Sequence, residues 1–139
     1  MGKDSGMLIK EVTAAILVHE GRLLIARRGP SARLAGKWEF PGGTIEAGET
    51  PDTCLIREMR EEFEIGIEVG PYVGDSVYHD DHGSIRLLAY LAFWKSGDLR
   101  CRVHDAFVFV RPGDLRDYDF CPADIPFVRG LSEGGIVIV

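Results

Sequence analysis

The stretch from Trp38 to Ile65, WEFPGGTIEAGETPDTCLIREMREEFEI, constrains the fold of this chain more than any other segment. It predicts a strand end, a double-glycine turn, a loop and then a helix rich in carboxylates. Thr50 is a favourable helix N-cap, Pro51 fits the first helical position, and Asp52 suits the positive end of the helix dipole. The rest of the chain is expected to support this unit.

The predicted helix has one apolar face. Leu55, Met59 and Phe63 recur every four residues and, together with Ile56, form a stripe that should pack on a sheet. Cys54 lies beside this stripe and is expected to fill space in the core.

The helix also has an acidic face. Glu58, Glu61 and Glu62 are three or four residues apart or adjacent, so their carboxylates crowd together and repel one another unless a cation is bound. Mg²⁺ prefers such oxygen ligands, and Arg57 is placed to hold Glu61. A solvated, charged helix face is the usual explanation of a motif of this kind. The glycine pair and the helix cap favour a metal site here.

Length and composition narrow the class of protein. The 139 residues suit one domain, which we place at residues 8–139, after a flexible N-terminus at residues 1–7. The three cysteines lack the spacing of a disulfide framework or a zinc site, which favours a reduced, cytoplasmic protein. No segment is long and apolar enough for a membrane span. The net charge of −6 argues against nucleic acid polymers as partners and leaves a small, metal-bridged phosphate ligand open.

Several apolar or β-branched runs outside the opening stretch predict strands. The run IRLLAYLAFW is apolar nearly throughout, so we expect it at the centre of a sheet with both faces covered. The apolar IVIV tail favours a small core strand over pairing with a second subunit, which leaves a monomer or a homodimer open. The predicted strands are Ile9–His19, Arg22–Arg28, Lys37–Phe40, Gly66–Asp75, Val77–His79, Ile85–Trp94 and Val103–Val110.

Two further segments have competing interpretations. A last helix is predicted to begin near Asp124, whose side chain is a candidate N-cap. His79, Asp80, Asp81 and His82 could bind a transition metal, but consecutive residues in a turn seldom converge on one ion, so a solvated hairpin is favoured.

The opening stretch resembles the Nudix box, G-x5-E-x7-R-E-U-x-E-E-x-G-U, in which U is a bulky aliphatic residue. The residues that match it at the required spacing are Gly43, Glu49, Arg57, Glu58, Met59, Glu61, Glu62 and Ile65. The resemblance implies an α/β fold, an α/β/α sandwich with a mixed central sheet, and the hydrolysis of nucleoside diphosphates linked to another group.

The same resemblance implies roles for the box residues. Glu58, Glu61 and Glu62, with the Gly42 carbonyl, would hold Mg²⁺ or Mn²⁺, and either Glu58 or Glu62 would be the general base. Arg57 would hold Glu61, and Glu49 would position Arg57 and the helix.

Two positions depart from the family pattern. Glu64 stands where the box has a glycine, which predicts altered helix termination with Gly66 taking over the glycine's role and metal binding retained. Val103 stands where the family has a glutamate. Either His104 or Asp105 replaces that glutamate, or the box carboxylates act alone, or activity is reduced. Apart from such a role, His104 is expected to be a partly buried structural histidine.

Beyond the box, the segments IARR, KWEFPGG and PADIP resemble the MutT-like branch, which converts nucleoside triphosphates to monophosphate and pyrophosphate. This resemblance places Arg28 and Arg33 near the nucleotide, Glu39 and Phe40 in the base pocket, and Asp124 at the base edge. An aspartate there can accept from the amino group of cytosine or from the N–H groups of guanine or 8-oxoguanine. The alternatives are a Nudix hydrolase of nucleotide sugars or dinucleotides and a non-catalytic nucleotide sensor.

Overall fold

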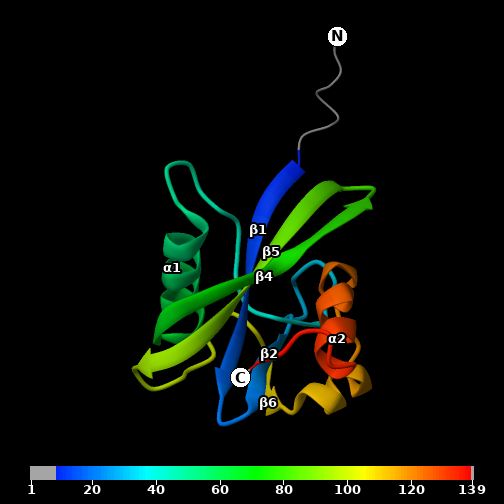
Figure 1. The fold of residues 1–139 in the computed structure, drawn as a ribbon. Helices are drawn as coiled ribbons and strands as arrows, with labels where there is room; N and C mark the ends of the chain where they lie inside the picture. The colour runs from blue at the N-terminus through cyan, green and yellow to red at the C-terminus, as the bar shows by residue number, and fades with distance from the viewer. Residues whose placement is uncertain (1–8, 139) are drawn as a thin grey trace.

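Two helices cover opposite faces of one six-stranded sheet in the computed structural model of the protein, which describes residues 9–138 (Figure 1). The predicted flexible terminus at residues 1–7 lies outside the described residues. The strands are β1 (Ile9–His19), β2 (Arg22–Arg27), β3 (Trp38–Glu39), β4 (Gly66–Asp80), β5 (Gly83–Ser96) and β6 (Ala106–Val110). The helices are α1 (Pro51–Phe63) and α2 (Ile125–Ser132), with short 3₁₀ helices η2 (Pro112–Asp117) and η3 (Pro122–Asp124) before α2.

The sheet is mixed, as the family resemblance implies. Its strand order is β3-β2-β1-β5-β4, and β6 pairs with β2 outside this path. β1 and β5 run parallel, in a register that pairs Ile9 with Ser84 and Val18 with Phe93, whereas the other neighbours are antiparallel. The middle strand of this order is β1. β5 is an inner strand paired with β1 and β4 and contributes to both core layers, so its coverage on both faces is confirmed, although it lies one strand from the middle.

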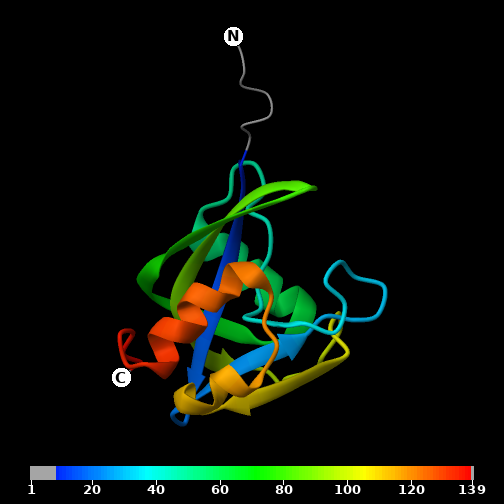
Figure 2. The same cartoon turned by 90° about the vertical axis from the view of Figure 1, so that its right-hand side faces the viewer.

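The two core layers follow from strand alternation. Successive side chains of a strand point to opposite faces, so Ala14 and Ile16 of β1 join the core on the α2 side, and Ala15 and Leu17 join the core on the α1 side. Figure 2 shows α2 in front of the strands and α1 behind them. Because both faces carry a helix, the inner strands are apolar on both sides, as α/β sandwiches require.

Helix α1 packs as predicted except at one position. Leu55, Met59 and Phe63 are fully buried, and so is Cys54. Ile56 is 37% exposed and lies outside the apolar stripe, which corrects its predicted place. The stripe repeats every four residues, so the residue directly after Leu55 turns away from the sheet.

The end of α1 also differs from the prediction. Glu64 itself takes the left-handed conformation, with φ 60° and ψ 31°, and its N–H donates to the Arg60 carbonyl at 3.0 Å. Gly66 does not take over this role, since it already belongs to β4 and has no positive φ. Arg102 Nη1 donates a hydrogen bond to the Glu64 carboxylate. A glycine at this position would have no side chain to accept it.

Three strand predictions need new boundaries. β4 is one continuous strand with irregular register near Val69, Tyr72 and Gly74, where two separate strands were expected. β6 begins at Ala106, so residues 103–105 form a bend. Among the described tail residues, 136–138 form no strand, although Ile136 and Ile138 pack on the α2-side core. In the described part of the chain, no helix combines the length and apolar character needed to cross a membrane.

Replacing Glu64 by glycine tests the cost of the left-handed helix end. A non-glycine residue in this conformation is destabilised by about 1–2 kcal/mol, so Glu64→Gly is expected to raise the free energy of unfolding by about 1 kcal/mol in urea unfolding followed by circular dichroism. Glu64→Ala is the control because it removes the carboxylate and keeps the Cβ. A glycine variant no more stable than the alanine variant would contradict the prediction.

Candidate functional site

The start of α1 is set by a reciprocal cap. The Thr53 N–H donates to the Thr50 hydroxyl at 3.2 Å, and the Thr50 N–H donates to the Thr53 hydroxyl at 3.0 Å. Pro51 occupies the first turn and Asp52 supplies its acidic residue, as predicted. The caps satisfy two of the unpaired N–H groups at the helix start, and they fix the direction in which α1 presents its acidic face.

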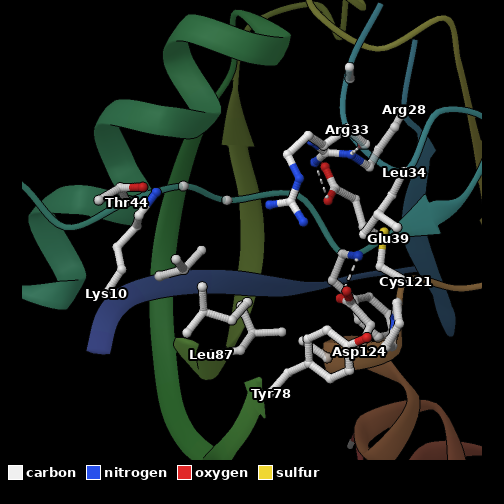
Figure 3. Close-up of a pocket in the computed structure, with 18 of the residues that line it drawn as sticks. Lys10, Arg28, Arg33, Leu34, Glu39, Thr44, Tyr78, Leu87, Cys121 and Asp124 are labelled. Carbon is white, nitrogen blue, oxygen red and sulfur yellow. Dashed lines mark hydrogen bonds and ion pairs between the residues drawn. The ribbon is translucent and has the colours of Figure 1, made fainter. Parts of the chain in front are cut away.

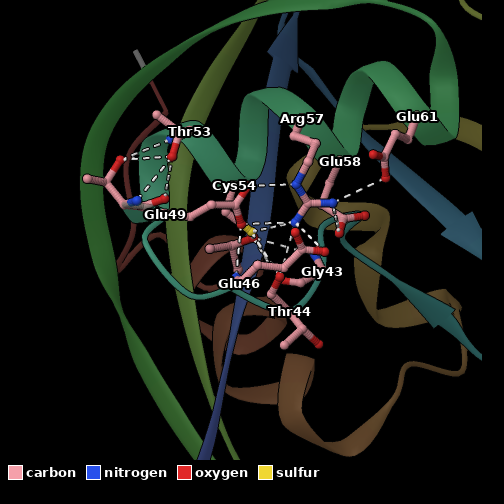
Figure 4. A network of polar contacts seen from close by, with 11 residues as sticks. Gly43, Thr44, Glu46, Glu49, Thr53, Cys54, Arg57, Glu58 and Glu61 are labelled. Atoms are coloured by element: carbon pink, nitrogen blue, oxygen red, sulfur yellow. Dashed lines mark hydrogen bonds and ion pairs between the residues drawn. The ribbon is translucent and has the colours of Figure 1, made fainter.

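Arg57 lies among the carboxylates of that acidic face and donates hydrogen bonds to three carboxylates (Figure 4). Its Nε and Nη2 donate to the two carboxylate oxygens of Glu49 at 2.6 and 3.0 Å. Its Nη1 donates to Glu58 at 3.0 Å and to Glu61 at 3.2 Å, and Nη2 also reaches the Thr44 carbonyl at 3.2 Å. A planar guanidinium can bridge several carboxylates in this way because its five N–H groups form a rigid fork.

The Glu49 carboxylate is held by Arg57. The hydrogen bond from Arg57, aided by the Glu46 N–H at 2.9 Å, lowers the pKa of Glu49 to about 2. The Arg57 pKa is raised by the same bond. The charged pair therefore persists at all ordinary pH values and joins the loop at Glu49 to the middle of α1, the positioning role predicted for Glu49.

Glu58 and Glu62 form the inner part of the acidic face. Only 13% of the Glu58 side chain is exposed, and the Oε1 atom of Glu62 is buried without a hydrogen-bond partner. Burial, followed by the neighbouring Glu58 carboxylate, raises the pKa of Glu62 to about 9. Glu61 lies outermost, with 58% of its side chain exposed.

The Gly42-Gly43 backbone lies against β1. The pair is extended, without positive φ, so the sharp turn predicted there is wrong. The Ala15 N–H donates to the Pro41 carbonyl at 2.7 Å and the Thr13 N–H donates to the Gly43 carbonyl at 2.8 Å. Carbonyls alternate along an extended chain, so the Gly42 carbonyl points away from β1, and no backbone hydrogen bond reaches it within the described residues.

Both glycines are required by close contacts. A Cβ on Gly42 would lie 1.9 Å from the Thr13 carbonyl oxygen, and a Cβ on Gly43 would lie 2.2 Å from the carboxylate carbon of Glu58. A side chain at Gly42 would push the segment away from β1, and a side chain at Gly43 would displace the Glu58 carboxylate. The glycine pair thus brings a free carbonyl beside the acidic face of the helix.

The donor set suits a hard divalent cation. Glu58, Glu61 and Glu62, with the Gly42 carbonyl, offer only oxygen ligands, which Mg²⁺ prefers. The buried, unpartnered Glu62 oxygen is a polar atom whose burial a cation would offset. Among residues 9–138, no group of three or more His, Cys, Asp or Glu side chains is already spaced to hold a metal ion. In this arrangement Arg57 Nη1 binds both Glu58 and Glu61, and a cation would compete with it.

A pocket of about 380 Å³ opens beside this acidic face (Figure 3). Its size falls within the range of small-molecule sites, about 300–1,000 Å³. Figure 3 shows Lys10 and Thr44 at one end and Glu39, Cys121 and Asp124 at the other. The predicted site residues that line it are Arg28, Arg33, Glu39, Phe40, Gly42, Glu62 and Asp124. The structure therefore brings all five predicted substrate-binding residues to one cavity.

Glu39 lies at the centre of a chain of polar contacts in the pocket wall. Its Oε1 accepts from Arg28 Nη1 at 3.0 Å, and its Oε2 lies 2.7 Å from His104 Nε2. Arg28 Nε also donates to the Arg33 carbonyl at 2.5 Å. These contacts join β3, the loop after β2 and the bend before β6.

Asp124 does not cap α2 with its side chain, which corrects the capping interpretation. Its Oδ1 instead accepts from the Phe40 N–H at 3.1 Å, across 84 positions of sequence. The residue is only 4% exposed, and burial, followed by the charge of Glu39, raises its pKa well above the ordinary value. A carboxyl group with a raised pKa can donate as well as accept a hydrogen bond.

Arg33 reaches across the mouth of the pocket. Its Nη2 donates to Asp80 Oδ2 at 2.7 Å and lies 3.2 Å from His82 Nδ1. The His82 N–H and the Arg33 side chain together lower the pKa of Asp80. Asp80–His82 is the tip of the β4–β5 hairpin, so the favoured interpretation of this segment as a hairpin is confirmed.

The residues that follow Val103 have other partners in the structure. Val103 lies in the bend and is 63% exposed. Asp105 accepts from Arg27 Nε at 2.8 Å, and His104 is paired with Glu39. The replacement of the family glutamate by either residue stays a prediction.

Sequence reasoning missed several residues that line the pocket, namely Lys10, Tyr78, Asp80 and His82. Lys10 lies in a strand run that also contains Glu11, so its charge alone did not distinguish it. Asp80 and His82 were considered as metal ligands or, preferably, as part of a solvated hairpin. Nothing in the local pattern indicated that their hairpin folds over the loop that carries Arg33.

The described site can be compared with known proteins. A family model for the NUDIX domain matches residues 7–131. The chain is 37% identical over 129 residues to the CTP pyrophosphohydrolase of Escherichia coli strain K12, covering 90% of this chain and 93% of that protein. It is 43% identical over 56 residues to the 8-oxo-dGTP diphosphatase of the same strain, covering 40% of this chain and 43% of that protein.

A similar fold occurs in the solution structure of the E. coli ORF135 protein. The TM-score is 0.79 at 35% sequence identity, and the match covers 92% of this chain and 91% of that one. The likeness extends over the sheet and both helices rather than over the acidic helix alone.

Glu62 should make the stability of the metal-free protein depend on pH. Its folded pKa of about 9 exceeds the ordinary value of 4.5. The stability that protonated Glu62 gives to the folded state is therefore fully present below about pH 4.5 and is lost as the pH rises towards 9. The melting temperature of Glu62→Gln in EDTA should therefore exceed that of wild type by a margin that grows from pH 5 to pH 8.5. Added Mg²⁺ should raise the wild-type melting temperature at pH 8 by several degrees and that of Glu62→Gln by less.

The exposed Glu61 offers the matched control. Glu61→Gln in EDTA should follow the pH dependence of wild type, since its carboxylate lies outermost. A Glu62→Gln margin that stays constant across this pH range would contradict the buried, protonated state of Glu62.

Proposed function

The chain belongs to the Nudix hydrolase family, and on that premise we propose that it hydrolyses nucleoside triphosphates to nucleoside monophosphate and pyrophosphate with a divalent cation. The proposed substrates are (d)CTP-like nucleotides or oxidised nucleotides such as 8-oxo-dGTP. The E. coli relatives named CTP pyrophosphohydrolase and 8-oxo-dGTP diphosphatase support this choice of substrate class.

The observation that carries the proposal is that one pocket is lined both by Glu62 of the acidic helix face and by hydrogen-bonding residues at its other end. Gly42, Gly43 and Glu62 line the pocket, and so do Glu39 and Asp124. A nucleotide has the matching polarity, with charged phosphates at one end and a hydrogen-bonding base at the other. Hydrolysis requires both ends to be held at once, because binding energy from the base helps to orient the reacting phosphate.

The acidic face would supply the chemistry. Glu58, Glu61, Glu62 and the Gly42 carbonyl would hold Mg²⁺, with Mn²⁺ as an alternative. A bound divalent cation neutralises phosphate charge and lowers the pKa of water. Glu58 or Glu62 orients the attacking water and accepts its proton. The Glu58 side chain is largely buried, and burial raises the pKa of Glu62.

Arg57 and Glu49 position other residues of the site and do not themselves contact the substrate. Their bidentate pair fixes the loop before α1 to the helix, and Arg57 Nη1 keeps Glu58 oriented at 3.0 Å. Carboxylates held in this way need little reorganisation when the substrate arrives.

The other end of the pocket would recognise the nucleoside. Arg28 and Arg33 supply positive charge near the nucleotide, and Phe40 packs beside Asp124, which offers oxygen atoms to the base edge. Glu39 adds a second carboxylate in the same wall. Two acidic groups favour bases with amino or ring N–H groups, which cytosine and 8-oxoguanine both have.

Removal of either inner carboxylate should abolish most activity. Glu58→Gln and Glu62→Gln are each expected to lower kcat by about 10²–10⁴-fold, the usual contribution of a general base. Pyrophosphate release with Mg²⁺ over a panel of unmodified and oxidised nucleoside triphosphates, nucleotide sugars and dinucleotides measures this. Glu68→Gln on β4, where the exposed carboxylate pairs with Lys95, is the matched control and should retain wild-type rates.

The outcome of the panel separates the alternatives. If wild-type protein released pyrophosphate from none of the triphosphates, the proposed function would be wrong. Cleavage of nucleotide sugars or dinucleotides alone would favour that other class of Nudix hydrolase. Intact hydrolysis in Glu62→Gln would remove Glu62 from the site.

Asp124 should control the choice of base. Asp124→Asn keeps an oxygen that can accept from the Phe40 N–H, so the fold of the pocket should survive. The change replaces a carboxyl oxygen by an amide donor, so the ranking of kcat/KM among bases should shift by about tenfold or more, while kcat for the best substrate changes less. An unchanged ranking would exclude Asp124 from base recognition.

A further inference from the structure

His104 is a buried histidine in the wall of the nucleotide pocket. Only 4% of its side chain is exposed, and its Nε2 lies 2.7 Å from Glu39 Oε2. Its ring stacks on Phe63, the last residue of α1, with centroids 5.5 Å apart and planes at 14°. Because a carboxylate oxygen faces Nε2, that nitrogen donates the hydrogen bond. The ring therefore joins the helix α1 to Glu39.

The segment that carries His104 is tied to the end of α1. The Arg100 N–H donates to the Phe63 carbonyl at 3.0 Å, and the Arg102 N–H donates to the Glu62 carbonyl at 2.9 Å. The His104 carbonyl in turn accepts from the Cys101 thiol at 3.0 Å. The last carbonyls of a helix lack partners within the helix, and this segment supplies them. Its position, and that of His104, follows the position of α1.

Glu39 has hydrogen-bonding capacity left over. An ionised carboxylate has about four lone-pair sites, and Arg28 and His104 each occupy one site, on different oxygens. The side chain lines the pocket and is 18% exposed. The two remaining sites can accept hydrogen bonds only if the carboxylate keeps its orientation, which the two partners on either side enforce.

We propose that His104 is a positioning residue for base recognition: it holds the Glu39 carboxylate so that its free lone pairs face the pocket and select bases that present N–H donors. This inference rests on the proposed function and extends it to a residue that does not itself need to touch the substrate. It also gives a role to the bend before β6, because this bend connects the end of α1 to the end of the pocket where the base is proposed to bind.

A purely structural role is the competing explanation, and the two can be separated. If the ring only filled space beside Phe63, phenylalanine would serve equally well. His104→Phe keeps the ring and the stacking but removes the donor to Glu39. His104→Gln keeps an N–H donor and loses the ring. Each variant therefore keeps one property of the histidine, either the aromatic ring or the N–H donor, and loses the other.

The experiment measures kcat and KM of these variants with Mg²⁺ over nucleoside triphosphates that differ only in base. In His104→Phe, the ratio of kcat/KM between the best and the worst base should fall by about tenfold or more. The fall should come mainly from changes in KM. In His104→Gln, which keeps an N–H donor, the ratio should fall less. In a Glu39→Gln background, His104→Phe should cause no further loss, since residues that act through one another are not additive.

His19→Phe provides the matched control. His19 also contacts an aromatic ring, that of Trp94, with centroids 5.0 Å apart and planes at 51°, but it lies outside the residues that line the pocket. Its replacement should leave the base ratio unchanged.

The possible results lead to distinct conclusions. A wild-type base ratio in His104→Phe, with lower thermal stability alone, would overturn the positioning role and leave the proposed function intact. Additive losses in Glu39→Gln and His104→Phe would also overturn it, because His104 would then act independently of Glu39. If the wild-type protein cleaved no nucleoside triphosphate, the proposed function would fail first and the inference would fail with it.

Discussion

The close approach of the Gly42-Gly43 backbone to β1 and to α1 is the contact on which the rest of the site depends. Backbone hydrogen bonds to Thr13 and Ala15 hold this segment flat on the central strand. The absence of a Cβ on Gly43 lets the Glu58 carboxylate pack directly on the backbone. A side chain at Gly42 would collide with the backbone of β1, and a side chain at Gly43 would displace the Glu58 carboxylate from its place on the backbone.

The electrostatics of the acidic face follow from this contact. Burial, followed by the neighbouring Glu58 carboxylate, raises the pKa of Glu62, and Arg57 compensates for the charges of Glu58 and Glu61. The buried Glu62 oxygen has no hydrogen-bond partner among the described residues. A cation bound beside it would offset the cost of burying that oxygen.

The base end of the pocket has a different origin. It is assembled from β3, the bend before β6 and the turn before α2, which are far apart in sequence. Glu39 meets His104 across 65 positions, and Phe40 meets Asp124 across 84 positions. The sheet brings these segments together because β2 pairs with both β3 and β6. The base recognition proposed for this end of the pocket therefore depends on three segments outside α1.

The sequence by itself determined the features that depend on neighbours a few residues apart. Helical periodicity and capping rules were sufficient for α1, its buried stripe and its crowded carboxylates, and β-branched runs located most strands within a few residues. Only the tertiary structure decided that Ile56 faces outwards, that Glu64 takes the left-handed conformation itself, and that Asp124 hydrogen-bonds Phe40 instead of capping its helix. These outcomes depend on which distant segment supplies the partner, and a buried polar group takes whichever partner the packing of the sheet places beside it.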